Sequence, residues 1–332
     1  MVISGRWVDR VEDHITLLYV PGKPSFSIFP PASAMFDTFT TSDITISPTV
    51  TIHTLTSPPK GPPLLLIHGF PQTHHIWHLV TPALVDSYTV ILVDLPGYGQ
   101  SSKPPSTPNH EEYSKSTLAQ HLVTLMQQHL SHPRFSILAH DRGARVAHQL
   151  AINHPSAVSK IMLLDILPTL SMYTLGRHTW YQKYWHWQFL SQPAPFPESL
   201  ILSNPGLFYE KFFGKHGVGG GGGGFDARVR SVYEGLLNDE ETVRGMCEDY
   251  RAGAGVDLLE QRRDREAGRK IKCEVLVVWG GKGAIATEFE DPVGIWREVC
   301  EGTVRGESVD GGHYVPEEFP EDVIRLAKEF FV

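Results

Sequence analysis

The sequence has few cysteines, and they are far apart. Cys247, Cys273 and Cys300 are the three in 332 residues, and no CxxC pair occurs. An odd number of isolated cysteines argues against both a disulfide framework and a zinc site made of thiolates. We therefore expect a protein of the reducing cytoplasm.

Long apolar runs and an excess of positive charge are also lacking. No apolar run approaches the roughly 18 residues that a membrane span needs, and Arg6, Asp9 and Glu12 interrupt the first twenty residues, unlike a secretory signal. The formal net charge is −8. A net-acidic surface attracts neither nucleic acid nor anionic membrane, so both are excluded as main partners. A small-molecule substrate remains, and an anionic one would need local cations.

Short apolar runs alternate with helical patterns along most of the chain. The Val, Ile and Leu content of the runs is typical of strands buried on both faces. Strands alternating with helices predict an α/β fold with a mostly parallel, doubly wound sheet. The expected strands are 49–55, 62–70, 88–96, 134–140, 160–166 and 274–280, and the clearest helices between them are 116–130 and 142–153.

The alternation divides the chain into four segments. Residues 1–44, rich in Pro, Ser and Thr, are expected to form an N-terminal extension of uncertain order. Residues 45–169 and 267–332 are expected to form the two parts of the α/β core. The aromatic-rich stretch 170–266 is predicted to be a helical cap, or lid, inserted over the sheet. Its run Gly219–Gly224 is expected to be a flexible loop without chemistry of its own.

The stretch "LAHDRGARV" carries the main chemical signal. A nucleophile elbow is a sharp turn between a strand and a helix. The reactive residue lies in this turn, with a small residue two positions before it and another two positions after it. Here Ala139 and Gly143 are the small residues and Asp141 is the central one. An aspartate is ionised at pH 7 and can attack a saturated carbon directly, giving an ester that water must hydrolyse. The alternative is an N-cap aspartate without a catalytic role.

Two further residues complete a candidate triad. His313, in "VDGGHYVPEE", lies in a Gly-rich loop before the last helix, where a base that activates water is expected. Asp165, at the end of "LLDILPT", is the preferred carboxylate to orient it. The competing position, after 274–280, offers no acid until Glu288. A capping or turn role is the alternative for Asp165.

The turn "LIHGFPQTHHIWH" supplies a candidate oxyanion hole. The backbone N–H groups of Phe70 and Arg142 are expected to point at the reacting ester. Four histidines in this stretch suggest a metal, but no acid joins them in the sequence and no HExxH occurs. We therefore predict no metal. The four are His68, His74, His75 and His78.

At this point the motifs resemble one family. "HGFPQTHHIWH", "DLPGYGQSSKP", "HDRGARVAHQLA", "LDILPT", "WHWQFLSQPAPFPE", "MCEDYRAGA" and "GGHYVPEE" are similar to motifs of the fluoroacetate (haloacetate) dehalogenases of the α/β-hydrolase superfamily. The resemblance runs from about residue 45 to the C-terminus, the cap included. The extension 1–44 and the six-glycine run lie outside it.

The resemblance implies roles for individual residues. Asp141 would attack the carbon bearing the halogen, and His313 with Asp165 would activate water. Arg142 and Arg145 would bind the substrate carboxylate, as planar guanidinium groups can. The donors to the departing halide would be His186, Trp187 and Tyr233. The resemblance also implies no cofactor and a homodimer.

The sequence therefore predicts a hydrolytic dehalogenase of short 2-haloacids. The nearest alternative is an epoxide hydrolase with the same Asp–His–Asp residues and two cap tyrosines. Such enzymes usually carry an apolar aromatic residue after the nucleophile, where this chain has Arg142. A non-catalytic small-molecule receptor on the same scaffold is a third alternative, although a receptor has no need of a complete triad.

Overall fold

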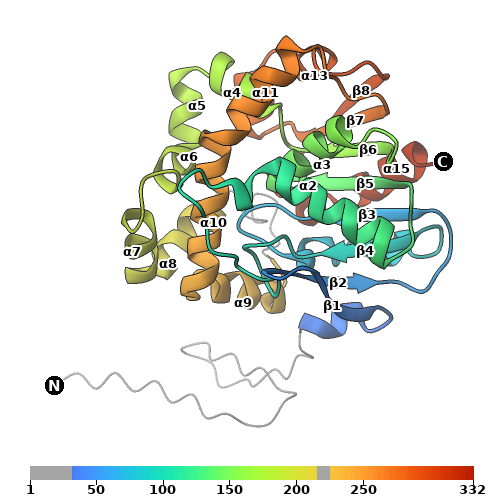
Figure 1. The fold of residues 1–332 in the computed structure, drawn as a ribbon, viewed down its shortest axis with the longest axis horizontal. Helices are drawn as coiled ribbons and strands as arrows, with labels where there is room; N and C mark the ends of the chain where they lie inside the picture. Colours follow the sequence, from blue (N-terminus) through green and yellow to red (C-terminus); the bar gives the residue numbers. More distant parts are fainter. Residues whose placement is uncertain (1–31, 215–224) are drawn as a thin grey trace, which may run out of the picture.

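A single sheet of eight strands lies at the centre of the molecule (Figure 1). The computed structural model describes residues 32–214 and 225–332. The strand order is β1-β2-β4-β3-β5-β6-β7-β8, with β1 and β2 antiparallel to their neighbours and the other pairs parallel. The strands are β1 Thr40–Ser47, β2 Val50–Thr56, β3 Pro63–Ile67, β4 Thr89–Val93, β5 Phe135–His140, β6 Val158–Leu164, β7 Glu274–Gly280 and β8 Val304–Val309.

The inner strands are buried on both faces, as predicted. On β3, Leu65 and Ile67 belong to one cluster of buried apolar side chains, and Leu64 and Leu66 belong to a second. Side chains alternate along a strand, so the two clusters are the two faces of the sheet. A continuous apolar run is therefore the correct signal for these strands.

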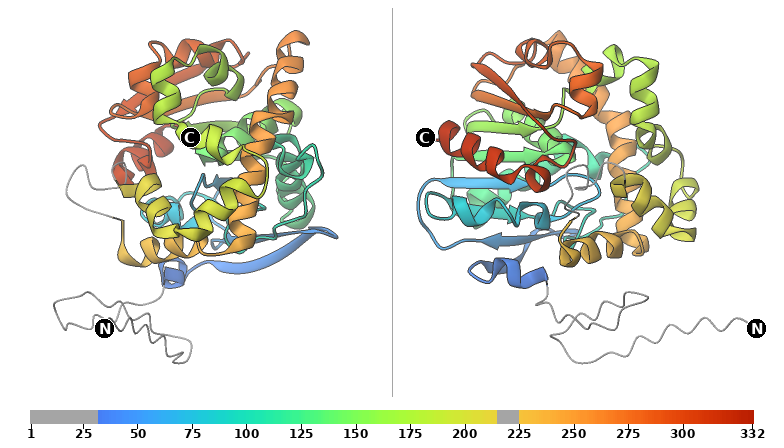
Figure 2. Two further views of the ribbon diagram at one scale, coloured as in Figure 1. Left: turned by 90° about the vertical axis from the view of Figure 1, so that its left-hand side faces the viewer. Right: turned by 180° about the vertical axis from the view of Figure 1, so that it is seen from behind.

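Helices cover both faces. The first cluster is completed by α2 (Lys115–Thr124) and α3 (Asp141–Asn153), and the second by α1 (Thr81–Leu84) and α15 (Pro320–Phe330). Figure 2 shows α15 on the face opposite α2 and α3. The remaining short helices of the core are η1 Ala32–Phe36, η2 His74–Trp77, η3 Glu111–Tyr113, η4 Leu125–His129, α12 Ala284–Glu288, α13 Pro292–Arg297 and α14 Val315–Glu318.

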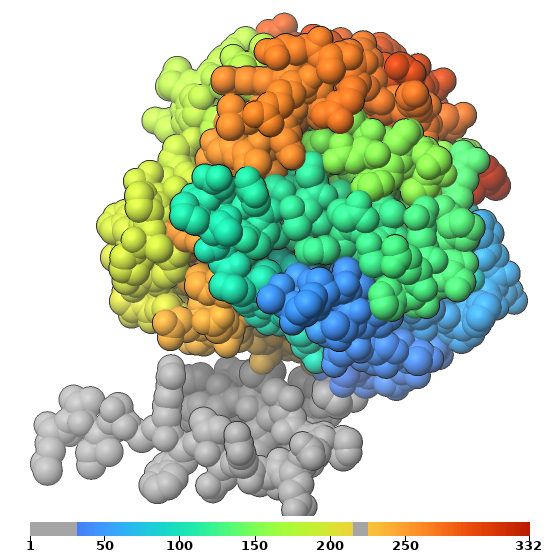
Figure 3. All heavy atoms as spheres, viewed as in Figure 1, coloured from blue at the N-terminus to red at the C-terminus, as the bar shows by residue number. Residues whose placement is uncertain are grey.

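The described residues between β6 and β7 form helices joined by short loops, in agreement with the predicted cap. Its helices pack directly onto the core (Figure 3). They are α4 Thr169–Leu175, α5 His178–Lys183, α6 Trp185–Leu190, α7 Phe196–Ser203, α8 Pro205–Tyr209, η5 Glu210–Gly214, α9 Ala227–Leu236, α10 Glu240–Ala254 and α11 Val256–Glu266. Among the described residues, no helix has the length and apolarity needed to cross a bilayer.

The sheet begins earlier than the sequence suggests. β1 starts at Thr40, five residues before the expected start of the core at 45, and Phe36 is buried edge-on against the rings of His74 and His75. Residues 32–44 of the extension are therefore part of the fold. The predictions for residues 1–31 and for the run Gly219–Gly224 lie outside the described residues.

Candidate active site

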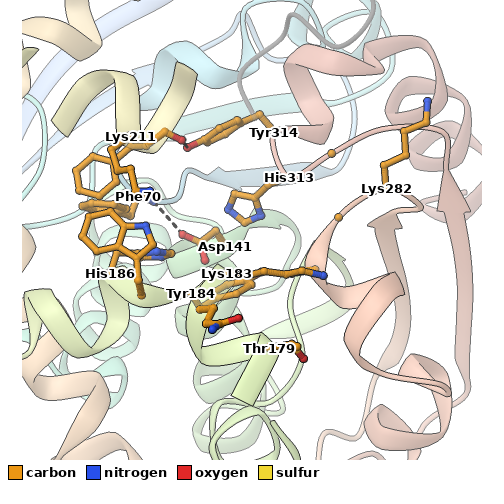
Figure 4. Close-up of a pocket in the computed structure, with 16 residues that line it drawn as sticks. Phe70, Asp141, Thr179, Lys183, Tyr184, His186, Lys211, Lys282, His313 and Tyr314 are labelled. Carbon is orange, nitrogen blue, oxygen red and sulfur yellow. Dashed lines mark hydrogen bonds between the residues drawn. The ribbon is translucent and has the colours of Figure 1, made fainter. Parts of the chain in front are cut away.

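Asp141 lies on a sharp bend where β5 ends and α3 begins. Its backbone is left-handed, with φ of 42°. A side-chain carbon at Gly143 would lie 2.2 Å from the His68 carbonyl oxygen, and one at Gly69 would lie 2.6 Å from the Asp141 Cβ. The bend therefore needs glycine at both positions. It places the Asp141 carboxylate in the wall of a cavity between cap and core (Figure 4).

The carboxylate of Asp141 is held in its charged form. Burial alone would raise its pKa, but the positive charges of His313 and Arg145 outweigh burial, so the pKa of Asp141 lies below its ordinary value. The Phe70 N–H donates a hydrogen bond to Asp141 Oδ2 at 3.2 Å. The Arg142 N–H belongs to the first turn of α3, where amides lack partners within the helix. The Phe70 amide thus contacts the carboxylate that would become an ester, and the Arg142 amide follows Asp141 directly in the chain.

His313 and Asp165 form a close pair. Asp165 directly follows β6, and its Oδ2 lies 2.6 Å from His313 Nδ1. Its Oδ1 accepts a hydrogen bond from the Gly280 N–H at 3.0 Å. The competing acid, Glu288, instead pairs with Lys183 at 2.5 Å. The structure therefore brings Asp141, His313 and Asp165 to one end of the sheet (Figure 4 shows the first two).

The two arginines of α3 are buried beside Asp141, three positions apart on one turn. Arg142 Nε and Nη2 donate to the side chain and the carbonyl of Asp249, both at 2.6 Å. Arg145 Nη1 donates to the Leu167 carbonyl and to Thr169 Oγ1. Arg145 Nε is buried with no hydrogen-bond partner among the described residues. A buried donor of this kind is available to an acceptor on a ligand, and binding of a substrate carboxylate stays a prediction.

A buried ion network keeps positive charge beneath Asp141. Asp249 Oδ1 lies 2.5 Å from Lys115 Nζ, which also lies 3.3 Å from Asp257. Arg142, Arg145 and Lys115 are thus opposed by two carboxylates, which leaves one positive charge over. Because Asp257 also faces Lys115, Arg142 and Lys115 are balanced by Asp249 and Asp257, and the cation left over is Arg145.

The sequence and the fold are both similar to those of known proteins. The family described as the alpha/beta hydrolase fold matches residues 62–320. The chain belongs to the α/β-hydrolase family. It is 40% identical to a fluoroacetate dehalogenase from Burkholderia sp. over 82% of this chain and 87% of that protein. It is 28% identical to a soluble epoxide hydrolase from Corynebacterium sp. (strain C12) over 82% of this chain and 91% of that protein.

A solved structure agrees with the fold. The crystal structure of an α/β-hydrolase from Nostoc sp. PCC 7120 superposes with a TM-score of 0.84 at 39% identity, covering 90% of this chain and 99% of that one. The predicted α/β-hydrolase fold with an inserted helical cap is therefore confirmed, and the protein is a hydrolase related to both dehalogenases and epoxide hydrolases.

The cap of this α/β-hydrolase brings two of the three expected halide donors together. His186 lines the cavity, and its ring stacks on Phe70 at 6.0 Å. Burial lowers the pKa of His186 to about 3, so the imidazole is neutral. Trp187 is buried under the Arg145 guanidinium, 4.6 Å from it, and its Nε1 has no hydrogen-bond partner among the described residues.

The third expected donor is elsewhere. The Tyr233 hydroxyl lies 3.3 Å from Glu317 and 3.4 Å from Gln72, and its ring stacks on Phe213. The Tyr233 side chain on α9 is therefore directed to Gln72 and Glu317, and not to the donors on α6. The structure thus contradicts the placement of Tyr233 beside His186 and Trp187.

Tyr250 occupies the place that was expected for Tyr233. Its ring centroid lies 5.8 Å from that of His186 and 6.4 Å from that of Trp187, and its hydroxyl is buried with no partner among the described residues. The motif "MCEDYRAGA" contains this residue, but periodicity gives no reason to prefer one cap tyrosine. The sequence signal that could have indicated Tyr250 is the adjacent Asp249, a carboxylate on the buried face of the same helix.

The histidine-rich turn also needs a correction. The structure does bring an acid to it, because His74 Nδ1 lies 2.9 Å from Asp94 Oδ1. Together with His53, these residues could hold a metal ion. However, Asp94 also accepts hydrogen bonds from the His74 and Gln100 amides, and His53 Nδ1 is paired with Asp43. Hydrogen bonds within the protein explain the cluster, and we assign it no chemistry.

Replacing Asp165 by Asn should shift the pH dependence of this α/β-hydrolase. Burial would lower the pKa of His313, but the hydrogen bond and charge of Asp165 raise it above its ordinary value. The neutral, basic imidazole therefore forms only above that raised pKa, and activity is lost as pH falls through it. In Asp165→Asn the acid limb of kcat should move to lower pH, and the plateau should fall by roughly 10²–10⁴-fold. An acid limb at the wild-type pH would contradict the pairing.

Proposed function

We propose that this α/β-hydrolase displaces halide from short 2-haloacids through an ester formed on Asp141. The observation that carries the proposal is an ionised, buried carboxylate at the elbow, followed within one turn by two buried guanidinium groups. A carboxylate nucleophile suits displacement at a saturated carbon. Guanidinium groups suit a substrate that carries a carboxylate of its own.

In the first step an Asp141 Oδ attacks C2 of the acid from the side opposite the halogen. The C–O bond forms as the carbon–halogen bond breaks, and the halide leaves with the bonding electron pair. Trp187 Nε1 and Tyr250 Oη are buried donors available to that halide, with His186 beside them. Donors aimed at the leaving group stabilise charge that develops only in the transition state.

In the second step His313 takes a proton from water, and the resulting hydroxide attacks Asp141 Cγ. The amides of Phe70 and Arg142 stabilise the oxyanion. The Cγ–O bond to the substrate then breaks, and the 2-hydroxy acid leaves with the proton that His313 returns. The proton that the hydroxide carried onto the Asp141 carboxyl is released to solvent, so Asp141 is again a carboxylate. Asp165 stabilises the imidazolium that exists between these transfers.

The charge around the cavity supports an anionic substrate. Lys183, Lys211 and Lys282 line it, and their side chains are exposed. Lys183 and Lys282 are paired with Glu288 and Asp310, whereas Lys211 forms no salt bridge among the described residues and adds local positive potential in a chain whose net charge is −8. The 40% identity to a fluoroacetate dehalogenase supports the same substrate class.

Epoxide hydrolysis is the second candidate, and Tyr250 favours it. Burial raises the pKa of Tyr250 well above its ordinary value, so the hydroxyl stays protonated and could donate to an epoxide oxygen. The relationship to a soluble epoxide hydrolase adds to this. Asp141 and His313 would act as in the first candidate.

Product analysis distinguishes the two candidates. Purified protein should release chloride from chloroacetate and fluoride from fluoroacetate, measured with ion-selective electrodes. The same preparation should form little diol from styrene oxide. Diol formation without halide release would favour the epoxide candidate.

Arg142→Leu should weaken haloacid turnover selectively. Loss of a charge-assisted hydrogen bond is expected to raise the KM for chloroacetate about 10–100-fold, with a much smaller effect on neutral chloroacetamide. Arg142→Lys keeps a cation opposite Asp249 and serves as the control for folding. Equal losses on the acid and the amide would refute the carboxylate role.

Tyr250→Phe should reduce fluoride release more than chloride release. Fluoride has the more concentrated charge, so a lost donor is expected to cost about tenfold in kcat for fluoroacetate and less for chloroacetate. Tyr233→Phe is the matched control and should change the fluoride-to-chloride ratio less than twofold. If Tyr233→Phe alters the ratio and Tyr250→Phe does not, the assignment of Tyr250 is wrong.

A further inference from the structure

The cavity above Asp141 is much larger than a two-carbon acid. Its volume is about 460 Å³. A haloacetate occupies on the order of 100 Å³, since a water molecule in the liquid takes about 30 Å³. The exposed residues Lys183, Lys211 and Lys282 lie on different sides of Asp141 and His313 in this space (Figure 4). A short acid that reacts at Asp141 therefore leaves most of the cavity unfilled.

We call the unfilled part of the cavity the outer chamber. Its walls are aromatic and include Phe70, Trp185, Phe212 and Tyr314. Trp185 and Phe212 stack with ring centroids 5.7 Å apart and planes at 5°. Phe212 meets Phe70 edge-on at 4.9 Å. The rings therefore form a continuous apolar surface that reaches from Phe70, whose amide contacts the Asp141 carboxylate, into the cap.

We propose that the outer chamber binds an aromatic substituent of the substrate, so that the preferred substrates are 2-haloacids with an aryl group beyond C2. The proposal rests on the dehalogenase function proposed above. Aromatic walls favour a flat apolar group through edge and face contacts. A pocket of several hundred Å³ whose wall includes a group of aromatic side chains is typical of sites for ligands larger than haloacetate.

A matched pair of substrates tests this. 2-Chloropropanoate and 2-chloro-3-phenylpropanoate have the same substitution at the reacting carbon and differ by one phenyl group. The wild-type kcat/KM should be at least tenfold higher for the phenyl acid. Equal or lower turnover of the phenyl acid would overturn the proposal.

Variants test whether the preference for the phenyl acid depends on the walls of the outer chamber. Trp185→Ala and Phe212→Ala should each reduce the preference for the phenyl acid at least fivefold. Phe196→Ala removes an exposed ring from α7 of the cap and should keep the wild-type preference. A preference that survives both chamber variants would overturn the assignment to these walls.

Inhibition of the wild type gives a readout that does not depend on folding of a variant. 3-Phenylpropanoate, which has no halogen, should inhibit chloroacetate turnover with a Ki at least tenfold below that of propanoate. Similar Ki values would contradict the chamber. If no chloroacid, chloroacetate included, releases chloride, the proposed function fails. Chloroacetate turnover without any gain from phenyl refutes this inference alone.

Discussion

Asp141→Asn should abolish halide release, with kcat/KM for chloroacetate falling by roughly 10⁴–10⁶-fold. The amide cannot form the ester, although it has almost the same shape as the carboxylate. Asparagine tolerates the left-handed backbone found at this position, so the elbow should keep its geometry. Halide release measured at high enzyme concentration checks the loss, and the melting temperature checks the fold.

Two observations separate the loss of a nucleophile from the loss of a charge. Asp322→Asn removes a half-exposed carboxylate on α15 and should keep activity within about twofold, as is usual for surface changes. Turnover near the wild-type rate in Asp141→Asn, in protein shown to retain the asparagine, would rule out attack by Asp141.

His313→Asn should release one equivalent of halide per active site and then stop. The first step needs only the Asp141 carboxylate, whereas ester hydrolysis needs a base to take a proton from water. Steady-state turnover should fall at least about 10³-fold while the first equivalent of halide is still released. Rapid mixing with chloroacetate, followed by chloride determination, measures both.

The control is a histidine of the cap. His178→Asn changes an exposed side chain at the start of α5 and should show wild-type kinetics. If His313→Asn released no halide even in a single turnover, the imidazole would be needed for the first step. The assignment of ester formation to Asp141 and of ester hydrolysis to His313 would then be wrong.

Much of the core could be predicted because its signals are local. The buried strands are continuous apolar runs, and the elbow is a short motif whose glycines are needed by the backbone. Asp165 could be chosen because it stands where a parallel strand ends. β1 and β8 were missed because they are edge strands, whose side chains are largely exposed and polar, so no buried run marks them.

The cap was harder to predict, since its residues meet through packing between helices. Tyr233 and Tyr250 are both buried tyrosines on cap helices, and only the three-dimensional arrangement shows that Tyr250 faces His186. The contact of Lys115 with Asp249 joins residues 134 positions apart. Neither periodicity nor spacing could indicate that this pair would adjust the charge around Arg142.

The ester on Asp141 is the central claim, and the mass of one peptide tests it most directly. His313→Asn protein is mixed with chloroacetate, quenched in acid, digested and analysed by mass spectrometry. We predict that the peptide containing Asp141 gains a carboxymethyl group and that fragmentation places the group on the Asp141 side chain. An unmodified Asp141 peptide from protein that has released one equivalent of chloride, or a carboxymethyl group on another residue, would contradict this account.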